Sequence, residues 1–178
     1  LLPTQAQRAT MICSLAIVQA IARTTGLAAR LKWPNDIVMG GKKLGGILSE
    51  LGLAGEHLDY VIVGMGLNVN LRMGDLPELA APATSLLEEL GRPVRRLDLL
   101  VAVLEDLDDL YQRLQAGWSP HETWRRRLET LGTRVQVTTT EGALEGIAED
   151  VTADGALLLR TDDGALLPFV AADVTLAR

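Results

Sequence analysis

The chain has 178 residues, of which 48% are hydrophobic and 3% aromatic, so it can bury an aliphatic core in one medium domain, or in one domain with a small appendage. Lys and Arg total 17 against 23 Asp and Glu, and the net charge of −6 argues against nucleic acid as the main partner. No uncharged apolar run reaches the roughly 18 residues of a membrane helix. The single cysteine, Cys13, can form neither an internal disulfide nor a metal site, so we expect a protein of the reducing cytoplasm.

The first half of the chain alternates between helical and strand patterns. Its predicted elements are, in chain order, a helix at 1–26, a strand at 29–32, two hairpin strands at 36–39 and 42–51, a strand at 60–71 and a loop at 72–82. Gly26 supplies the helix stop. Only Gly40 and Gly41 separate the hairpin strands, and both positions of such a two-residue turn require positive φ, which glycine adopts readily.

The second half changes from a helical period to an alternating one. Its predicted elements are helices at 85–90, 98–116 and 119–132, followed by short strands at 135–137, 144–148, 156–159 and 166–170. The predicted N-caps are Ser85, Asp98 and Ser119, and a Glu follows the first and third after three residues, as in a capping box. Evenly spaced short strands indicate a small barrel, so we place a domain boundary between residues 131 and 132.

The glycine turn also predicts which hairpin side chains are neighbours. With Gly40 and Gly41 as the loop, Val38 faces Lys43 and Asp36 faces Gly45. Asp36, Val38 and Lys43 then share one face, and Asp36 and Lys43 become diagonal neighbours, about 7–8 Å apart at the backbone. A shared ligand explains this arrangement, and an ordinary surface ion pair explains it equally well.

The strand at 60–71 has an unusual face. Gly64, Gly66, Asn68 and Asn70 alternate along it, whereas the opposite face is apolar. Glycine inside a strand costs roughly 0.5–1 kcal/mol relative to alanine, so its presence indicates close approach of a ligand or of another backbone. Residues alone leave these two readings open.

Two segments together resemble a known family. The first runs Lys32-Trp33-Pro34-Asn35-Asp36 and continues through the hairpin to Lys43, Gly45, Gly46 and Glu50; the second is Val63-Gly64-Met65-Gly66-Leu67-Asn68-Val69-Asn70. Their order and spacing are similar to the signature of biotin protein ligases. The resemblance implies an α+β fold related to class II synthetases, with a mixed or antiparallel sheet packed by helices (residues 1–131), followed by an SH3-like β-barrel (132–178).

The resemblance also implies a two-step acyl transfer. Biotin and ATP form biotinyl-5′-AMP, which then biotinylates a lysine of a biotin carboxyl carrier protein. It assigns Lys43 to the biotin carboxylate and the α-phosphate, and Asp36 to orienting the attacking amine. The other residues expected to bind biotin or the adenylate are Lys32, Trp33, Asn35, Gly45, Gly46, Gly64, Gly66 and Asn68. Mg²⁺ is expected on the ATP phosphates, with no metal site of the protein's own.

Several alternatives stay open. The family carries a glycine- and arginine-rich ligand loop upstream of these motifs, and the sequence from Leu1 onward does not contain it. This chain alone is therefore expected to bind biotin weakly or not at all, and a truncated or degenerate ligase acting as a non-enzymatic interaction module is an alternative. A lipoate-type ligase is the enzymatic rival. A homodimer through the sheet edge fits the family. A repressor would need a basic helix-turn-helix, which this acidic chain lacks.

Overall fold

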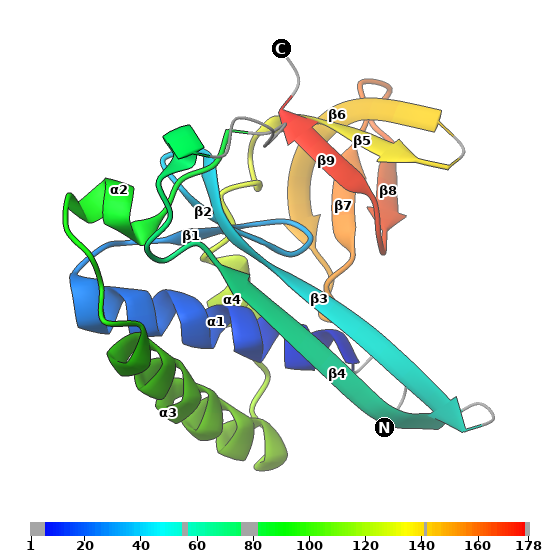
Figure 1. Ribbon diagram of the computed structural model, residues 1–178. Helices are drawn as coiled ribbons and strands as arrows, with labels where there is room; N and C mark the ends of the chain where they lie inside the picture. The colour runs from blue at the N-terminus through cyan, green and yellow to red at the C-terminus, as the bar shows by residue number, and fades with distance from the viewer. Residues whose placement is uncertain (1–5, 55–56, 76–81, 141, 177–178) are drawn as a thin grey trace.

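The computed structural model describes residues 6–54, 57–75, 82–140 and 142–176, which form two packed parts (Figure 1). A four-stranded antiparallel sheet in the order β1-β2-β3-β4 lies against helices, and a five-stranded antiparallel sheet in the order β8-β7-β6-β5-β9 forms the C-terminal part. The elements are α1 (Ala6–Thr25), β1 (Arg30–Lys32), β2 (Asp36–Met39), β3 (Lys42–Ala54), β4 (His57–Leu67), η2 (Met73–Asp75), α2 (Leu86–Leu90), α3 (Arg96–Gln115), α4 (His121–Arg125), β5 (Arg134–Thr139), β6 (Gly142–Val151), β7 (Leu157–Arg160), β8 (Leu166–Phe169) and β9 (Asp173–Leu176).

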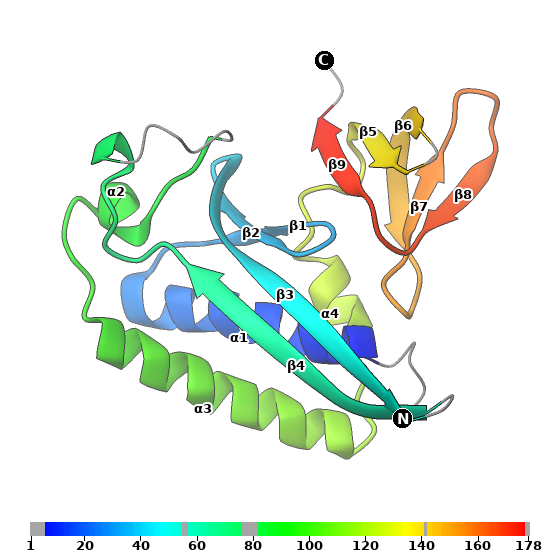
Figure 2. The same ribbon diagram turned by 45° about the vertical axis from the view of Figure 1, so that its right-hand side comes forward.

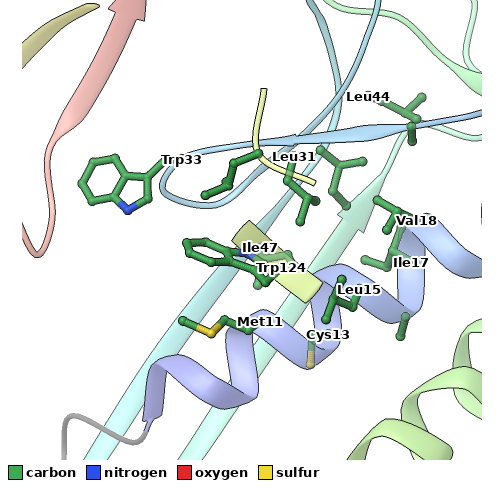
Figure 3. Close-up of a cluster of buried hydrophobic side chains, with 14 of the residues drawn as sticks. Met11, Cys13, Leu15, Ile17, Val18, Leu31, Trp33, Leu44, Ile47 and Trp124 are labelled. Carbon is green, nitrogen blue, oxygen red and sulfur yellow. The ribbon is translucent and has the colours of Figure 1, made fainter. Parts of the chain in front are cut away.

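Helix α1 is the centre of the core. Twelve of its residues are buried, and Leu15 and Ile17 pack with Leu31 and Trp124 in the cluster of Figure 3. Cys13 is buried in this cluster, and burial raises the pKa of its thiol to about 11. Since the helix is apolar nearly all round, it must be covered on several sides.

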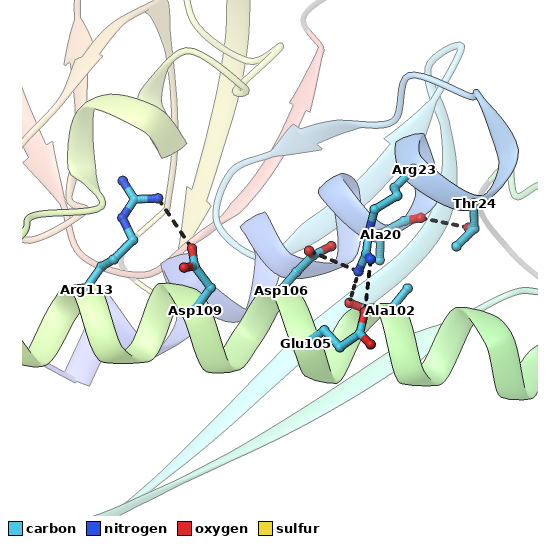
Figure 4. Close-up of polar contacts among 8 residues, drawn as sticks. All are labelled: Ala20, Arg23, Thr24, Ala102, Glu105, Asp106, Asp109 and Arg113. Atoms are coloured by element: carbon cyan, nitrogen blue, oxygen red, sulfur yellow. Dashed lines mark hydrogen bonds and ion pairs between the residues drawn. The ribbon is translucent and has the colours of Figure 1, made fainter.

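Helix α3 lies beside α1 and is joined to it through Arg23 (Figure 4). The guanidinium donates to the carbonyl oxygen of Ala102 at 2.9 Å and contacts the carboxylates of Glu105 and Asp106 at 2.9 and 3.1 Å. These contacts place the basic C-terminal end of α1 against acidic residues of α3.

None of the helices in the described part of the chain is long and apolar enough to span a membrane.

Three predicted helix starts have different outcomes. Ser85 caps α2 as predicted, with its Oγ accepting from the Glu88 amide at 3.2 Å, but the Glu88 carboxylate accepts from the Met73 amide instead of completing a capping box. The prediction for Asp98 is wrong, because α3 begins at Arg96 and Asp98 lies in its first turn. Ser119 is also not a cap: Pro120 occupies the N-cap of α4, which ends at Arg125 rather than near residue 132.

The C-terminal strands wrap into a small barrel-like unit (Figure 2). The four predicted strands are confirmed as β5 to β8, and their inward positions are buried: Val135, Val137, Ala148, Leu157 and Leu159. The sequence analysis missed β9, which pairs with β5 so that Val174 faces Val137. We propose that this unit begins at residue 132, just before β5.

Candidate functional site

The β2–β3 hairpin has the predicted turn and an unpredicted bulge. Gly40 and Gly41 adopt φ of 56° and 74°, as the two-residue turn requires. Val38 faces Lys43 as expected, but Asp36 faces Gly46, not Gly45, because the register shifts between Ile37 and Val38. The extra residue is Leu44, which is fully buried.

The bulge decides which residues surround Asp36. In a regular strand, Lys43 and Gly46 would point to opposite faces, since they are three residues apart. The extra residue between them places both beside Asp36. A Cβ on Gly46 would lie 3.4 Å from Asp36 Oδ1 and 3.5 Å from Lys43 Cε. Gly46, rather than Gly45, therefore provides the space next to this pair.

Asp36 and Lys43 form an ion pair. The Lys43 Nζ lies 2.5 Å from Asp36 Oδ1, and the side chains are 47% and 20% exposed respectively. The long side chain of Lys43 thus reaches the carboxylate diagonally across the hairpin, as the sequence predicts. The pair is in contact with solvent, and an exposed ion pair contributes little to stability, so its placement needs another explanation.

A first cleft of about 920 Å³ opens over this pair and over β3 and β4. Eight of the predicted binding residues line it: Asn35, Asp36, Lys43, Gly45, Gly46, Gly64, Gly66 and Asn68. Gly64 and Gly66 are exposed, and a Cβ on either would have no neighbour closer than 3.7 Å. These two glycines therefore form an open floor, which the packing of the chain itself does not require.

Gly45 is glycine for a different reason. A Cβ there would lie 2.4 Å from the carbonyl oxygen of Gly66, which is a backbone atom. Any side chain would separate β3 from β4, so Gly45 is required by strand packing. The two explanations that the sequence left open, a ligand and another backbone, thus apply to different glycines.

Asparagine side chains brace the rim of the first cleft. Asn35 Nδ2 donates to the Ile47 carbonyl at 2.8 Å, and the Ile47 amide donates back to the Asn35 carbonyl at 2.9 Å. Asn68 Nδ2 donates to the Thr84 carbonyl at 3.1 Å, which joins the end of β4 to the segment before α2. These two amides hold the backbone around the cleft.

A second cleft, of about 1040 Å³, lies between the β1–β2 segment and the barrel. It shares Asn35, Asp36 and Lys43 with the first cleft. Its other lining residues include Lys32 on one side, and Thr138, Asp173 and Thr175 of β5 and β9 on the other. The ion pair therefore stands where the two clefts meet.

Lys32 and Trp33 lie away from the glycine floor. Both line the second cleft, and Trp33 is only 2% exposed, with its indole Nε1 donating to the carbonyl oxygen of Gly155 in the barrel. The barrel residues of this cleft were not predicted. Thr138 and Asp173 lie 95 and 130 residues after Lys43, and no local pattern marks them.

The described part of the chain contains no group of three or more His, Cys, Asp or Glu side chains that could hold a metal ion. The chemistry that the residues offer is a lysine cation and a carboxylate side by side, over a floor open to a flat or extended ligand. A cation at this place favours a ligand with carboxylate or phosphate oxygens.

Two family models match the chain. Residues 2–68 match one described as the biotin/lipoate A/B protein ligase family, and residues 130–176 match the biotin protein ligase C terminal domain. Together they contain nearly all the residues of both clefts. The second model covers strands β5 to β9.

Individual proteins are similar over most of the chain. The bifunctional ligase/repressor BirA of Bacillus subtilis is 33% identical over 170 residues, which cover 94% of this chain and 52% of that protein. The biotin–[acetyl-CoA-carboxylase] ligase of Paracoccus denitrificans is 33% identical over 172 residues, covering 89% and 69%. The biotin protein ligase of Aquifex aeolicus, solved in complex with biotin and ATP, superimposes with a TM-score of 0.77 at 27% identity and covers 96% of this chain and 71% of that one. The chain thus spans about half the length of the Bacillus relative.

Proposed function

Because this chain belongs to the biotin protein ligase family, we propose that the full-length protein uses ATP to attach biotin to a lysine of a biotin carboxyl carrier protein. The observation that carries the proposal is the Asp36–Lys43 pair at the junction of two clefts. One cleft then holds the small substrates, and the other admits the protein substrate.

In the first step, an oxygen of the biotin carboxylate attacks the α-phosphorus of ATP. A new P–O bond forms, pyrophosphate leaves, and the product is biotinyl-5′-AMP. Negative charge gathers on the oxygens of the α-phosphate in the transition state, so a fixed cation beside them lowers the barrier. Lys43 Nζ is the cation at the edge of the glycine floor, where biotin and the adenylate lie against Gly46, Gly64 and Gly66.

In the second step, the lysine amine of the carrier attacks the acyl carbon, AMP leaves, and an amide bond forms. The amine must be neutral to attack. Asp36 is a weak base toward an ammonium group, so its role is to orient the amine and to stabilise the positive charge that develops on it. The second cleft gives a route to this carboxylate from the barrel side, past Asp173 and Thr175.

Mg²⁺ enters this scheme with the nucleotide. Mg²⁺ is usually held by substrate phosphates together with one or two carboxylates, and the described residues contain no group of three or more acidic, His or Cys side chains that would hold it independently, so the ATP phosphates would be its main ligands. When bound, the cation supplies charge neutralisation on the phosphates.

A homodimer through the edge strand β4 is a further proposal, supported by the exposed Tyr60 and Ile62.

A biotin-dependent exchange assay tests the first step. The full-length protein is incubated with ATP and labelled pyrophosphate, with biotin, lipoate or no acid added. We expect exchange with biotin and only background with lipoate, because residues 130–176 match the family model of the biotin protein ligase C terminal domain. Exchange with lipoate alone would assign the lipoate-type activity instead. No exchange with either acid would leave the non-enzymatic interaction module.

A further inference from the structure

We propose that Trp33 is a positioning residue: it fastens the segment that carries Lys32 and Asp36 to the C-terminal barrel, and so lets the barrel set the geometry of the Asp36–Lys43 pair. The inference rests on the proposed ligase function but does not follow from it. It also replaces the direct ligand contact that the sequence suggested for Trp33.

Trp33 is held at two points, one in the barrel and one in the segment just before it. Its indole Nε1 donates to the carbonyl oxygen of Gly155 at 2.9 Å, and its backbone amide donates to Thr130 Oγ1 at 2.9 Å. Trp33 is 2% exposed and lies in the turn between β1 and β2 (Figure 3), and it is not among the residues that line the first cleft. A buried N–H with a partner is costly to leave unpaired, so the indole has one preferred position.

The partner of the indole belongs to a hydrogen-bonded turn. In the turn at 152–156, the Thr152 amide donates to the Ala156 carbonyl at 2.8 Å, and the Gly155 amide donates to the Thr152 carbonyl at 2.8 Å. Gly155 has a φ of +86°, and a Cβ on it would lie 3.0 Å from Met11 Cε of α1. The turn therefore packs tightly against both Trp33 and the main helix.

The path from Trp33 to the ion pair is short. Lys32 faces Asp36 across the β1–β2 turn, so Trp33 lies within the three residues that connect them. Leu31, the residue before Lys32, is held by two backbone hydrogen bonds. Its amide donates to the Arg127 carbonyl at 2.9 Å, and its carbonyl accepts from the Glu129 amide at 2.8 Å. A displacement of Trp33 must therefore be taken up by the segment leading to Asp36, whose carboxylate lies 2.5 Å from Lys43 Nζ.

The glycine floor does not depend on this connection. Gly64 and Gly66 belong to β4, which pairs with β3 at the far side of the sheet from β1. Loss of the Trp33 contact should therefore disturb the reacting groups more than the surface against which biotin lies. The expected signature is a fall in kcat with little change in biotin affinity.

The first test is Trp33→Phe in the full-length protein, which removes the N–H and keeps an aromatic ring. We expect kcat for biotinyl-adenylate formation, per folded molecule and well below the melting temperature, to fall at least about tenfold, since a misplacement of about 1 Å can cost about a hundredfold. The Kd for biotin should change by less than about threefold. A mere loss of stability would lower the melting temperature without this split.

The barrel supplies a matched pair of variants. Residues 161–165 repeat the turn at 152–156: the Thr161 amide donates to the Ala165 carbonyl at 3.0 Å, the Gly164 amide donates to the Thr161 carbonyl at 2.9 Å, and Gly164 has a φ of +87°. A Cβ on Gly164 would have no neighbour within 4 Å. Gly155→Ala and Gly164→Ala thus introduce the same backbone strain, but only the first lies in the turn whose carbonyl accepts from Trp33, and only its methyl group would press on Met11 Cε.

We expect Gly155→Ala to reproduce the kcat loss of Trp33→Phe and Gly164→Ala to keep wild-type kcat. The Gly155→Asn and Gly164→Asn pair serves if the alanine variant does not fold, because asparagine tolerates positive φ better. Equal kcat values for the two glycine variants, or wild-type kcat in Trp33→Phe, would overturn the positioning role alone. A wild-type protein without adenylate formation would instead overturn the ligase proposal, and the positioning role with it.

Discussion

Asp36 and Lys43 illustrate how two ordinary charged residues become a candidate site through one backbone irregularity. The extra residue Leu44 turns its own side chain into the core and brings Lys43 and Gly46 to the face of Asp36. Without it, the pair would still be near neighbours, but Gly46 would point to the other face. The bulge thus provides the space beside the charge pair.

The two residues are predicted to serve different steps. Asp36→Asn keeps the shape of the side chain and removes its charge, so biotinyl-adenylate formation should fall less than about fivefold, whereas transfer to the carrier should fall roughly 10- to 100-fold. Single-turnover transfer from preformed adenylate, measured beside pyrophosphate release, separates the steps. An equal loss in both would assign Asp36 to nucleotide binding instead.

At the scale of elements, β3 and β4 carry glycines with two distinct purposes, and substitution should separate them. Gly66→Ala places a methyl group in open space, so the melting temperature should hold or rise, since alanine is favoured over glycine in a strand by about 0.5–1 kcal/mol. Biotin affinity should nevertheless fall at least about tenfold, because the methyl group occupies the floor. Isothermal titration and thermal unfolding measure the two quantities.

Gly45→Ala is the matched variant on the neighbouring strand. Its methyl group would press on the Gly66 carbonyl, so we expect a clear fall in the melting temperature, with overpacking of this kind typically costing about 1–3 kcal/mol. If Gly66→Ala also lowered stability and left biotin affinity unchanged, the floor would be a packing feature and not a ligand surface.

The C-terminal strands contribute one wall of the second cleft, and Asp173 is its exposed carboxylate. Asp173→Lys should raise the KM for the carrier domain about tenfold, because it repels the incoming lysine, while adenylate formation and transfer to hydroxylamine should stay within about twofold. Asp163→Lys is the control, because Asp163 is an exposed carboxylate in the barrel turn at 161–165 and lines neither cleft. A changed rate of adenylate formation would indicate that this cleft holds phosphates.

How far the sequence predicts these elements depends on whether their signals are local. Turn residues and periodicity predict the glycine turn, the core helix and four of the barrel strands. The bulge in β3 has no such local signal, because one extra residue does not change the composition of the strand. Strand β9 is four residues long and was not predicted. The family resemblance assigned Trp33 to the ligand, and no local pattern marks its hydrogen-bond partner, Gly155, which lies 122 residues away.

At the scale of the whole molecule, the barrel and the sheet domain are joined by polar contacts as well as by Trp33. Arg125 of α4 donates to both carboxylate oxygens of Asp150 in β6, at 2.5 and 3.1 Å. The Arg125 hydrogen bond is the main reason that the pKa of Asp150 lies below its ordinary value. His121 Nε2, also on α4, lies 3.1 Å from the carbonyl oxygen of Val151.

The Arg125–Asp150 ion pair predicts that the stability of the folded protein depends on pH. Because the pKa of Asp150 is lowered by folding, the pair stabilises the folded state at pH values above the unfolded pKa of about 3.9, and the gain is lost as pH falls through the lower folded pKa. Asp150→Asn should therefore be less stable than wild type at pH 7, by less than about 1 kcal/mol given the exposure of the pair. The two should converge at acidic pH. Urea unfolding across pH 3 to 7 measures the difference, and a constant difference would contradict the assignment.

Lys43 is proposed to be the cation that brings biotin and ATP together. This role is tested by ATP- and biotin-dependent labelling of a purified biotin carrier domain with the full-length protein, its Lys43→Ala variant and its Lys42→Ala variant. Lys42 is the adjacent exposed lysine and lines neither cleft. We predict labelling by the wild type and by Lys42→Ala, and a loss of about a hundredfold or more in Lys43→Ala. Equal labelling by all three proteins would remove Lys43 from the site, and no labelling by the wild type would contradict the ligase function itself.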